Sequence, residues 1–338
     1  MPWLWVALLT TATGLLAGHL VRILPRAPAP VRTAERDPRA KVESFLGLLA
    51  SGITRVFVED REAAQRLLRQ VEVASRDEPA LSVVPITHGD YSMRFSVRVV
   101  ETLHVVELWW PPPPPRLAVV VDDLGGDLGR AEALLDLEIP ITPSIIPHLC
   151  QSREVAEAAR DRGRAFLLHL PMQPRGYPEI DPGRGALLEG MSEPDIRRTV
   201  AEDLAAVPGV SGVNNHMGSR FTELEEPLRW VMDELAKREL FFLDSVTSPA
   251  TVAATVARES GLATVRRDVF IDNNREVEAI GRQIDAAVAK ARQNGRAVAI
   301  GHPYPETLEA LRQAAARIRA EGVRVVPLGE LVTPSGGS

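Results

Sequence analysis

The pattern of hydrophobic and polar positions changes at five consecutive prolines, Pro111 to Pro115. After them, short continuous apolar runs alternate with longer amphipathic segments. Continuous apolar runs are typical of parallel strands that are covered on both faces. The runs lie at 116–122, 141–146, 165–170, 209–215, 240–244, 265–272, 297–301 and 323–327. Amphipathic segments at 192–207, 224–238, 248–260 and 305–321 predict helices between them.

Repeated strand–helix units of this number predict an α/β fold, a distorted (β/α) barrel over residues 116–332. A doubly wound open sheet is the alternative, and the lack of a G-x-G-x-x-G after a strand disfavours its dinucleotide-binding form. Two helix starts are visible in the sequence. Ser192 with Asp195 is close to a capping box, and Ser248 is expected as an N-cap with Pro249 in the first helical position.

The pattern before the prolines is different. Residues 91–110 alternate apolar and polar positions, which predicts two half-buried antiparallel strands, and 42–53 and 59–74 have helical spacing. Residues 41–110 therefore form a small α+β module, with 111–115 as a polyproline linker and 25–40 as a Pro-, Ala- and Arg-rich linker. Residues 1–24 carry no charged side chain before Arg22, which favours a signal peptide or membrane anchor over a buried helix.

Composition narrows the possible functions. The chain has 338 residues, 45% hydrophobic and 25% charged, as an ordinary globular protein has. A net charge of −6 and few aromatic residues give no reason to expect nucleic acid as a partner. The single cysteine, Cys150, excludes an intramolecular disulfide and a cysteine-rich zinc finger.

Polar side chains stand where the predicted strands end, and a barrel keeps its active site at the carboxyl ends of its strands. Each residue alone has an ordinary structural explanation: an Asp pair can cap a helix, and a lone His can be a core residue. Together, several histidines and a carboxylate at one barrel mouth are what a catalytic divalent metal, such as zinc, requires. The residues are Asp122, Asp123, His148, His169, Asn214, Asn215, His216, Asp244, Ser245, Asp272 and His302.

Several motifs, in order and spacing, resemble the divergent polysaccharide deacetylase family of bacterial envelope proteins. They are VVVDDLGG, TPSIIPH, FLLHLPMQP, GVNNHMGSRFT, FFLDS and AIGHPYPET, and they cover residues 116–332. This resemblance implies a deacetylase barrel, an N-acetylated carbohydrate as substrate, and a divalent metal held by one Asp and two His. It implies Asp122 as general base, Asp123 as a ligand, and His302 as general acid.

The H-x-x-x-H ligand pair of the main deacetylases is missing, because His169 has no histidine four residues on. We therefore expect Asp123, His169 and His216 as the metal ligands. His148 has no counterpart in this set and is expected to be dispensable. Asn214, Asn215, Arg220, Asp244, Ser245 and Asp272 are expected to bind substrate.

Three functions remain open. The first is a metal-dependent deacetylase of envelope polysaccharide or peptidoglycan fragments, attached to the membrane or exported by residues 1–24. The second is a catalytically inactive glycan-binding or scaffold protein, with the 41–110 module contacting an unknown protein partner. The third is a cytoplasmic metal-dependent amidohydrolase with a small substrate.

Overall fold

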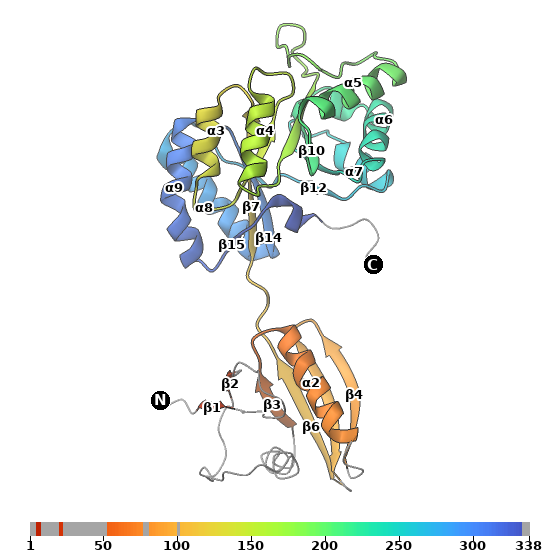
Figure 1. Cartoon of the computed structure of the whole chain (residues 1–338), viewed down its shortest axis with the longest axis vertical. Coiled ribbons are helices and arrows are strands. Elements are labelled where there is room, and N and C mark those ends of the chain that lie inside the picture. Colours follow the sequence, from red (N-terminus) through yellow and green to blue (C-terminus); the bar gives the residue numbers. More distant parts are fainter. Residues whose placement is uncertain (1–4, 8–19, 23–52, 77–80, 100–101, 333–338) are drawn as a thin grey trace. The chain divides into compact units, whose positions relative to one another are not determined.

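The computed structural model describes residues 5–7, 20–22, 53–76, 81–99 and 102–332 (Figure 1). The chain divides into two compact units, Met1–Pro113 and Pro114–Ser338, and each is considered by itself. Within the described residues, no helix has both the length and the apolar composition needed to cross a bilayer. The predicted signal or anchor at 1–24 and the linker at 25–40 lie almost entirely outside these residues.

The first unit is a sheet with a helix on one face. Its elements are β1 (Trp5–Ala7), β2 (Leu20–Arg22), β3 (Ile53–Phe57), α2 (Arg61–Arg76), β4 (Leu81–Gly89), β5 (Ser92–Val99) and β6 (Thr102–Trp109). The strand order is β1-β2-β3-β6-β5-β4. Apolar side chains of α2, such as Ala64 and Leu67, pack on Phe95 and Val106 of the sheet.

The predictions for this unit are confirmed in part. The helix predicted at 59–74 and the two antiparallel strands within 91–110 are present as α2, β5 and β6. Strand β4 was not predicted. The helix predicted at 42–53 lies outside the described residues except for Ile53, which begins β3.

The second unit alternates strands and helices. Its strands are β7 (Arg116–Leu124), β8 (Ile141–Ile145), β9 (Leu167–Met172), β10 (Gly212–Met217), β11 (Phe241–Asp244), β12 (Thr264–Arg266), β13 (Val269–Phe270), β14 (Arg296–Gly301) and β15 (Arg324–Val325). Its helices are α3 (Leu128–Leu135), α4 (Ser152–Asp161), α5 (Glu193–Ala206), α6 (Glu225–Ala236), α7 (Ala253–Glu259), α8 (Val277–Asn294) and α9 (Pro305–Ala320), with short 3₁₀ turns η1 (Phe221–Glu223) and η2 (Leu328–Leu331).

All strands of this sheet are parallel, and the sheet curls into an incomplete barrel. The order is β12-β11-β10-β9-β8-β7-β14-β13, with β15 beside the start of β7. The single strand predicted at 265–272 is in fact two, and they form the two edges of the sheet. Arg267 N–H donates to Asp244 O of β11 (3.0 Å), while Asp268 N–H donates to Val298 O of β14 (2.8 Å). Arg267 and Asp268 thus connect the two edge strands, β12 and β13, and bring the edges of the sheet together. This arrangement confirms a distorted barrel rather than a doubly wound sheet.

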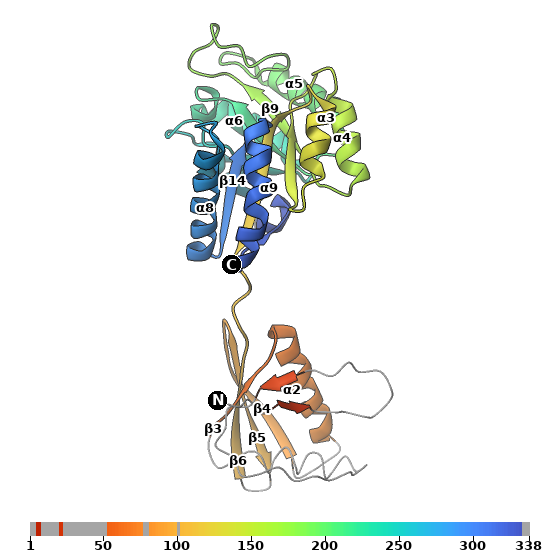
Figure 2. The same ribbon diagram turned by 90° about the vertical axis from the view of Figure 1, so that its left-hand side faces the viewer.

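Successive side chains of each strand point to opposite faces of the sheet, so the second unit has two hydrophobic cores. In β7, Leu117 and Val119 face the helices, whereas Ala118 and Val120 face the interior of the curled sheet. The helices lie around the outside (Figures 1 and 2). The interior also packs against Leu328 and Leu331 of η2. Interior positions at the carboxyl ends of the strands are therefore available for a site above an apolar floor.

One predicted helix start is confirmed and one is wrong. The Ser192 side chain caps α5 and accepts a hydrogen bond from Asp195 N–H (3.4 Å). Helix α7, by contrast, begins at Ala253 with Val252 as its N-cap. Ser248 Oγ instead donates to Glu223, so residues 248–252 form a separate turn before the helix.

Candidate metal centre

The site lies on the interior face, at the carboxyl ends of the strands. Asp122 of β7 and His169 of β9 lie an even number of residues from interior positions of their strands, so their side chains point to the interior. Asn214 and His216 of β10 point the same way. Parallel pairing puts Asn214 directly beside His169. A spacing of two residues within each strand therefore brings all of them to one face.

Asp123 reaches the same site through an irregular backbone. A residue adjacent to Asp122 in a regular strand would point to the opposite face. Here the register between β7 and β8 shifts between Val121 and Leu124, and Asp123 has φ 58°, in the left-handed region. The bulge re-aims the side chain, so both carboxylates face the histidines.

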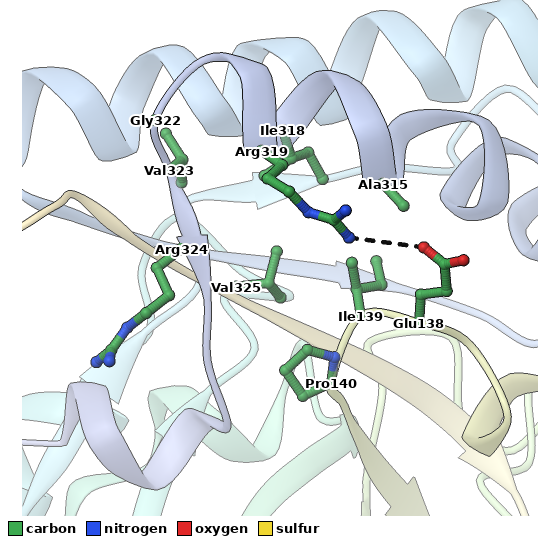
Figure 3. Close-up of a pocket in the computed structure, with 10 residues that line it drawn as sticks. All are labelled: Glu138, Ile139, Pro140, Ala315, Ile318, Arg319, Gly322, Val323, Arg324 and Val325. Carbon is green, nitrogen blue, oxygen red and sulfur yellow. Dashed lines mark ion pairs between the residues drawn. The ribbon is translucent and has the colours of Figure 1, made fainter.

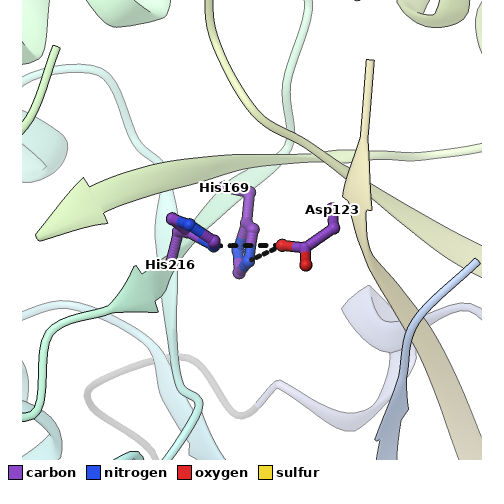
Figure 4. Close-up of side chains that lie close together, drawn as sticks. All are labelled: Asp123, His169 and His216. Carbon is purple, nitrogen blue, oxygen red and sulfur yellow. Dashed lines mark ion pairs between the residues drawn. The ribbon is translucent and has the colours of Figure 1, made fainter. Parts of the chain in front are cut away.

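The structure brings the three predicted ligands together (Figure 4). Asp123 Oδ1 lies 3.2 Å from His169 Nε2 and 3.0 Å from His216 Nδ1, and one ligand atom from each residue lies within 4.8 Å of the others. About 3.3 Å separates two ligand atoms that each lie about 2.0–2.1 Å from a tetrahedral zinc. Asp123 Oδ1 is buried and has no hydrogen bond of good geometry among the described residues, as expected of an atom that serves a metal.

The donor set fits a divalent cation with a free position. One carboxylate and two imidazoles are a common ligand set for zinc, and a catalytic site leaves one position for water or substrate. The Asp123 side chain is 34% exposed, so solvent reaches the site from that side.

Asn214 fixes the orientation of His169. Its Oδ1 accepts hydrogen bonds from Ser144 Oγ (2.6 Å) and His169 Nδ1 (3.0 Å). Its Nδ2 donates to Asp122 Oδ1 (2.9 Å) and Ser245 Oγ (3.1 Å). With the proton on Nδ1, the lone pair of His169 Nε2 faces Asp123, which is the tautomer that a metal requires.

Burial and mutual charge set the protonation of the site. Burial opposes ionisation of Asp123, but His169 and His216 outweigh it and hold its pKa well below the ordinary range. Burial raises the pKa of Asp122 despite the opposing effects of His169 and Asn214. Burial acts against protonation of His169, yet the two carboxylates raise its pKa. Two acidic groups in a buried site favour a cation there.

His302 approaches from the other side of Asp123. It follows β14, and its Nδ1 lies 3.0 Å from Asp272 Oδ1 while its Nε2 lies 3.8 Å from Asp123 Oδ2. Asp272 Oδ2 also accepts from His302 N–H and from Thr307 Oγ1. A side chain at Gly301 would come within 3.1 Å of Asp272 Oδ2 and 2.7 Å of Ile271, so glycine permits this approach.

Most of the predicted substrate-binding residues are buried and have structural partners. Asn215 donates to Met217 O and accepts from Ser245 N–H. Asp244 accepts from Val246 N–H, and burial raises its pKa.

Asn214 is fully buried, and Asp272 orients His302. These five buried residues therefore have partners within the protein through which they can position the site, and their contact with substrate stays a prediction. Only Arg220 is partly exposed, and it pairs with Glu189 (2.9 Å).

His148 lies outside the ligand cluster. Its Nε2 is 2.7 Å from Oδ1 of Asp203, a buried residue of α5. Burial raises the pKa of Asp203 to about 8. Like Asp123, Met217 and Val246, His148 has a positive φ near the end of a barrel strand. Strained backbone of this kind clusters at functional sites.

A separate groove of about 400 Å³ lies at the amino ends of the strands (Figure 3). Ile139, Ile318 and Val323 line it, and Glu138 pairs with Arg319 at 3.6 Å. It contains no histidine, and its carboxylate has a partner. The groove therefore offers no alternative metal centre.

Sequence reasoning missed three residues of the site. Ser144 donates a hydrogen bond to Asn214, and the rings of Phe270 and Tyr304 lie near that of His302, with centroids 5.1 and 5.5 Å away. A signal for Ser144 was available, because Thr142 and Ser144 are polar at alternate positions of the buried run 141–146. The aromatic residues gave no comparable signal.

Comparison with known proteins identifies the family. The sequence model of the divergent polysaccharide deacetylase family matches residues 119–332, and the chain belongs to that family. It is 37% identical over 215 residues to an uncharacterized protein of Haemophilus influenzae, covering 64% of this chain and 76% of that one. It is 35% identical over 197 residues to the uncharacterized protein YibQ of Escherichia coli, covering 58% of this chain and 61% of YibQ.

A solved structure has the same fold. The crystal structure of the uncharacterized protein ATU2773 from Agrobacterium tumefaciens matches with a TM-score of 0.63 at 27% identity, over 66% of this chain and 92% of that one. This match agrees with the curled parallel sheet described above and confirms the predicted fold class.

Proposed function

We propose that the protein is a metal-dependent hydrolase that removes acetyl groups from N-acetylated envelope polysaccharide or peptidoglycan fragments. The observation that carries the proposal is the convergence of Asp123, His169 and His216, with Asp122 and His302 beside them. Membership of the divergent polysaccharide deacetylase family supports the carbohydrate substrate.

We assign the three converging residues as ligands of one divalent ion, zinc by the chemistry of the donor set. When bound, such an ion would polarise the acetamide carbonyl and acidify a water molecule. The residues of the chain then have to orient the substrate and move two protons.

Asp122 is the general base. Its Oδ1 is held by Asn214, and its Oδ2 faces the ligand cluster, 3.7 Å from His169 Nε2. Its position beside the ligand cluster puts this carboxylate within reach of a water molecule at the free position of the site. It accepts the proton of the water that attacks the acetamide carbon.

His302 is the general acid. Burial disfavours its protonated form, but Asp272 and the charges of Asp123 and Asp122 outweigh burial and raise its pKa. Asp272 holds Nδ1, so Nε2 is directed to the site and gives its proton to the departing amine. Acetate and the free amino sugar are the products.

We further propose that the protein acts in the cell envelope. The support is the apolar sequence of residues 1–24, in which no charge precedes Arg22. Fractionation of cells that express the full chain or a version without residues 1–24 tests it. Recovery of both in the cytosol would favour the small-substrate amidohydrolase.

Acetate release tests the reaction. Zinc-loaded protein should release acetate from N-acetylated oligosaccharides or peptidoglycan fragments, and Asp122→Asn and His302→Gln should lower the rate by about 10²–10⁴. If the metal is bound and these glycans bind without acetate release, the inactive glycan-binding function is correct instead.

A further inference from the structure

His302 is the centre of a row of five neighbouring side chains, here called the stack. Its ring lies tilted against those of Phe270 and Tyr304. The guanidinium carbon of Arg267 lies 5.1 Å from the Phe270 centroid, and that of Arg275 lies 3.8 Å from the Tyr304 centroid. Guanidinium groups are attracted to aromatic faces at such distances, so both ends of the stack are held in place.

The two arginines of the stack have different environments. Arg267 is partly buried, its pKa is lowered by that burial, and it donates to the backbone oxygens of Ser245 (2.6 Å) and Val246 (2.8 Å). Arg275 is exposed, and none of the described residues forms an ion pair or hydrogen bond with its guanidinium. Its N–H donors are therefore available to a ligand.

Two arginines near the carboxyl end of β10 do not have N–H donors available in this way. Arg220 pairs with Glu189, and Arg175 pairs with Glu223 at 2.7 Å. Their charges are neutralised within the protein, so an anion has little reason to bind there. Arg275 is the contrasting case: an unpaired cation, oriented by Tyr304, one ring away from the general acid.

A second arginine lies beside the residue that follows His302, but it is paired. Arg130 of α3 donates to Pro303 O (3.2 Å), next to His302, and lies 3.6 Å from Asp127. Because Asp127 pairs with Arg130, Arg275 is the better candidate for binding an anion beside His302.

We propose that Arg275 binds a carboxylate carried by the glycan, so that the substrate class is an acidic N-acetylated polysaccharide. This inference rests on the proposed function, because it requires an acetamido sugar at the metal centre. The planar fork of a guanidinium binds carboxylates in a bidentate manner, and stacking on Tyr304 orders it before the ligand arrives. The carboxylate then holds the neighbouring acetamide beside His302.

Binding of two matched glycans tests the inference separately from catalysis. Calorimetry on the zinc-loaded full chain, in an Asp122→Asn background that does not consume substrate, would compare hyaluronan and chitin oligosaccharides of equal length. The first alternates N-acetylglucosamine with an acidic sugar, and the second is neutral. We expect the acidic glycan to bind roughly tenfold more tightly, as one charge-assisted bidentate contact provides.

Variants of Arg275 test whether this residue causes the preference for the acidic glycan. Arg275→Gln should abolish it without weakening the neutral glycan, and Arg275→Lys should retain only part of it because lysine lacks the planar fork. Arg319→Gln is the control, since it removes the same charge from the amino-end groove (Figure 3). Raising the salt concentration should reduce the preference.

Equal affinity for the two glycans, binding of neither, or a preference unchanged in Arg275→Gln would overturn the inference. Acetate release by the protein with Asp122 intact decides the proposed function independently. An acidic preference without acetate release would retain the inference for a glycan-binding site and reject the deacetylase.

Discussion

Replacing Asn214 by alanine should weaken metal binding although Asn214 is not a ligand. The asparagine makes four hydrogen bonds, and two of them serve His169 Nδ1 and Asp122 Oδ1. Removal leaves both buried groups without these partners, at a cost of roughly 1–3 kcal/mol each. For His169, that cost corresponds to the roughly 10–100-fold loss of affinity that outer partners of metal ligands typically cause.

Competition with a chromophoric chelator would measure zinc affinity in Asn214→Ala. Thr142→Ala is the matched control, because Thr142 Oγ1 accepts a buried hydrogen bond from Leu328 N–H (3.0 Å) without touching the site. Both variants should lose stability, measured as Tm, and Asn214→Ala should lose more because it removes four hydrogen bonds; only Asn214→Ala should lose metal affinity.

Asn214→Asp separates the two functions of the asparagine. A carboxylate can still accept from His169 Nδ1–H, so zinc affinity should recover most of the loss. It can no longer donate to Asp122, and it adds a negative charge there, so turnover should stay low. Wild-type zinc affinity in Asn214→Ala would refute the reasoning.

Four other predictions follow from the same geometry. Asp122→Asn should retain zinc but lower turnover by about 10²–10⁴, measured by acetate release with parallel metal analysis. His216→Ala should abolish stoichiometric zinc binding in equilibrium dialysis, and full occupancy would remove it from the ligand set. The activity should be bell-shaped in pH. Asp272→Asn should shift its alkaline limb to lower pH, because the hydrogen bond of Asp272 helps keep His302 protonated; an unmoved limb would contradict this. Limited proteolysis should cleave near Pro111–Pro115 and release a stable fragment from about Arg116, whereas resistance between 105 and 120 would indicate one cooperative unit.

The sequence predicted the barrel because continuous apolar runs are a strong signal for buried parallel strands. It could not predict where the sheet opens. Residues 265–272 have one apolar pattern, and only the tertiary hydrogen bonds of Arg267 and Asp268, to β11 and β14, divide them into two edge strands. Ser248 was misjudged for a similar reason, because its hydroxyl binds Glu223 rather than capping α7.

The candidate ligands were predictable because each lies near the carboxyl end of a strand, and residues two apart share a face. Alternation along a strand could not predict that the side chains of Asp122 and Asp123 both point to the site. That arrangement depends on the bulge and on the positive φ of Asp123. The roles of Asn214 and Asp272 were also hidden. Polar residues at strand ends look alike in a sequence, and the structure is needed to show which of them are buried and bonded to one another.

The location of a bound ion is the most direct test of the metal centre. Crystals grown with zinc should give an anomalous difference peak about 2.0–2.2 Å from one Asp123 oxygen, His169 Nε2 and His216 Nδ1. The same peak should disappear in His216→Ala. A fully loaded protein whose peak lies elsewhere, or which binds no zinc at millimolar concentration, would contradict the account.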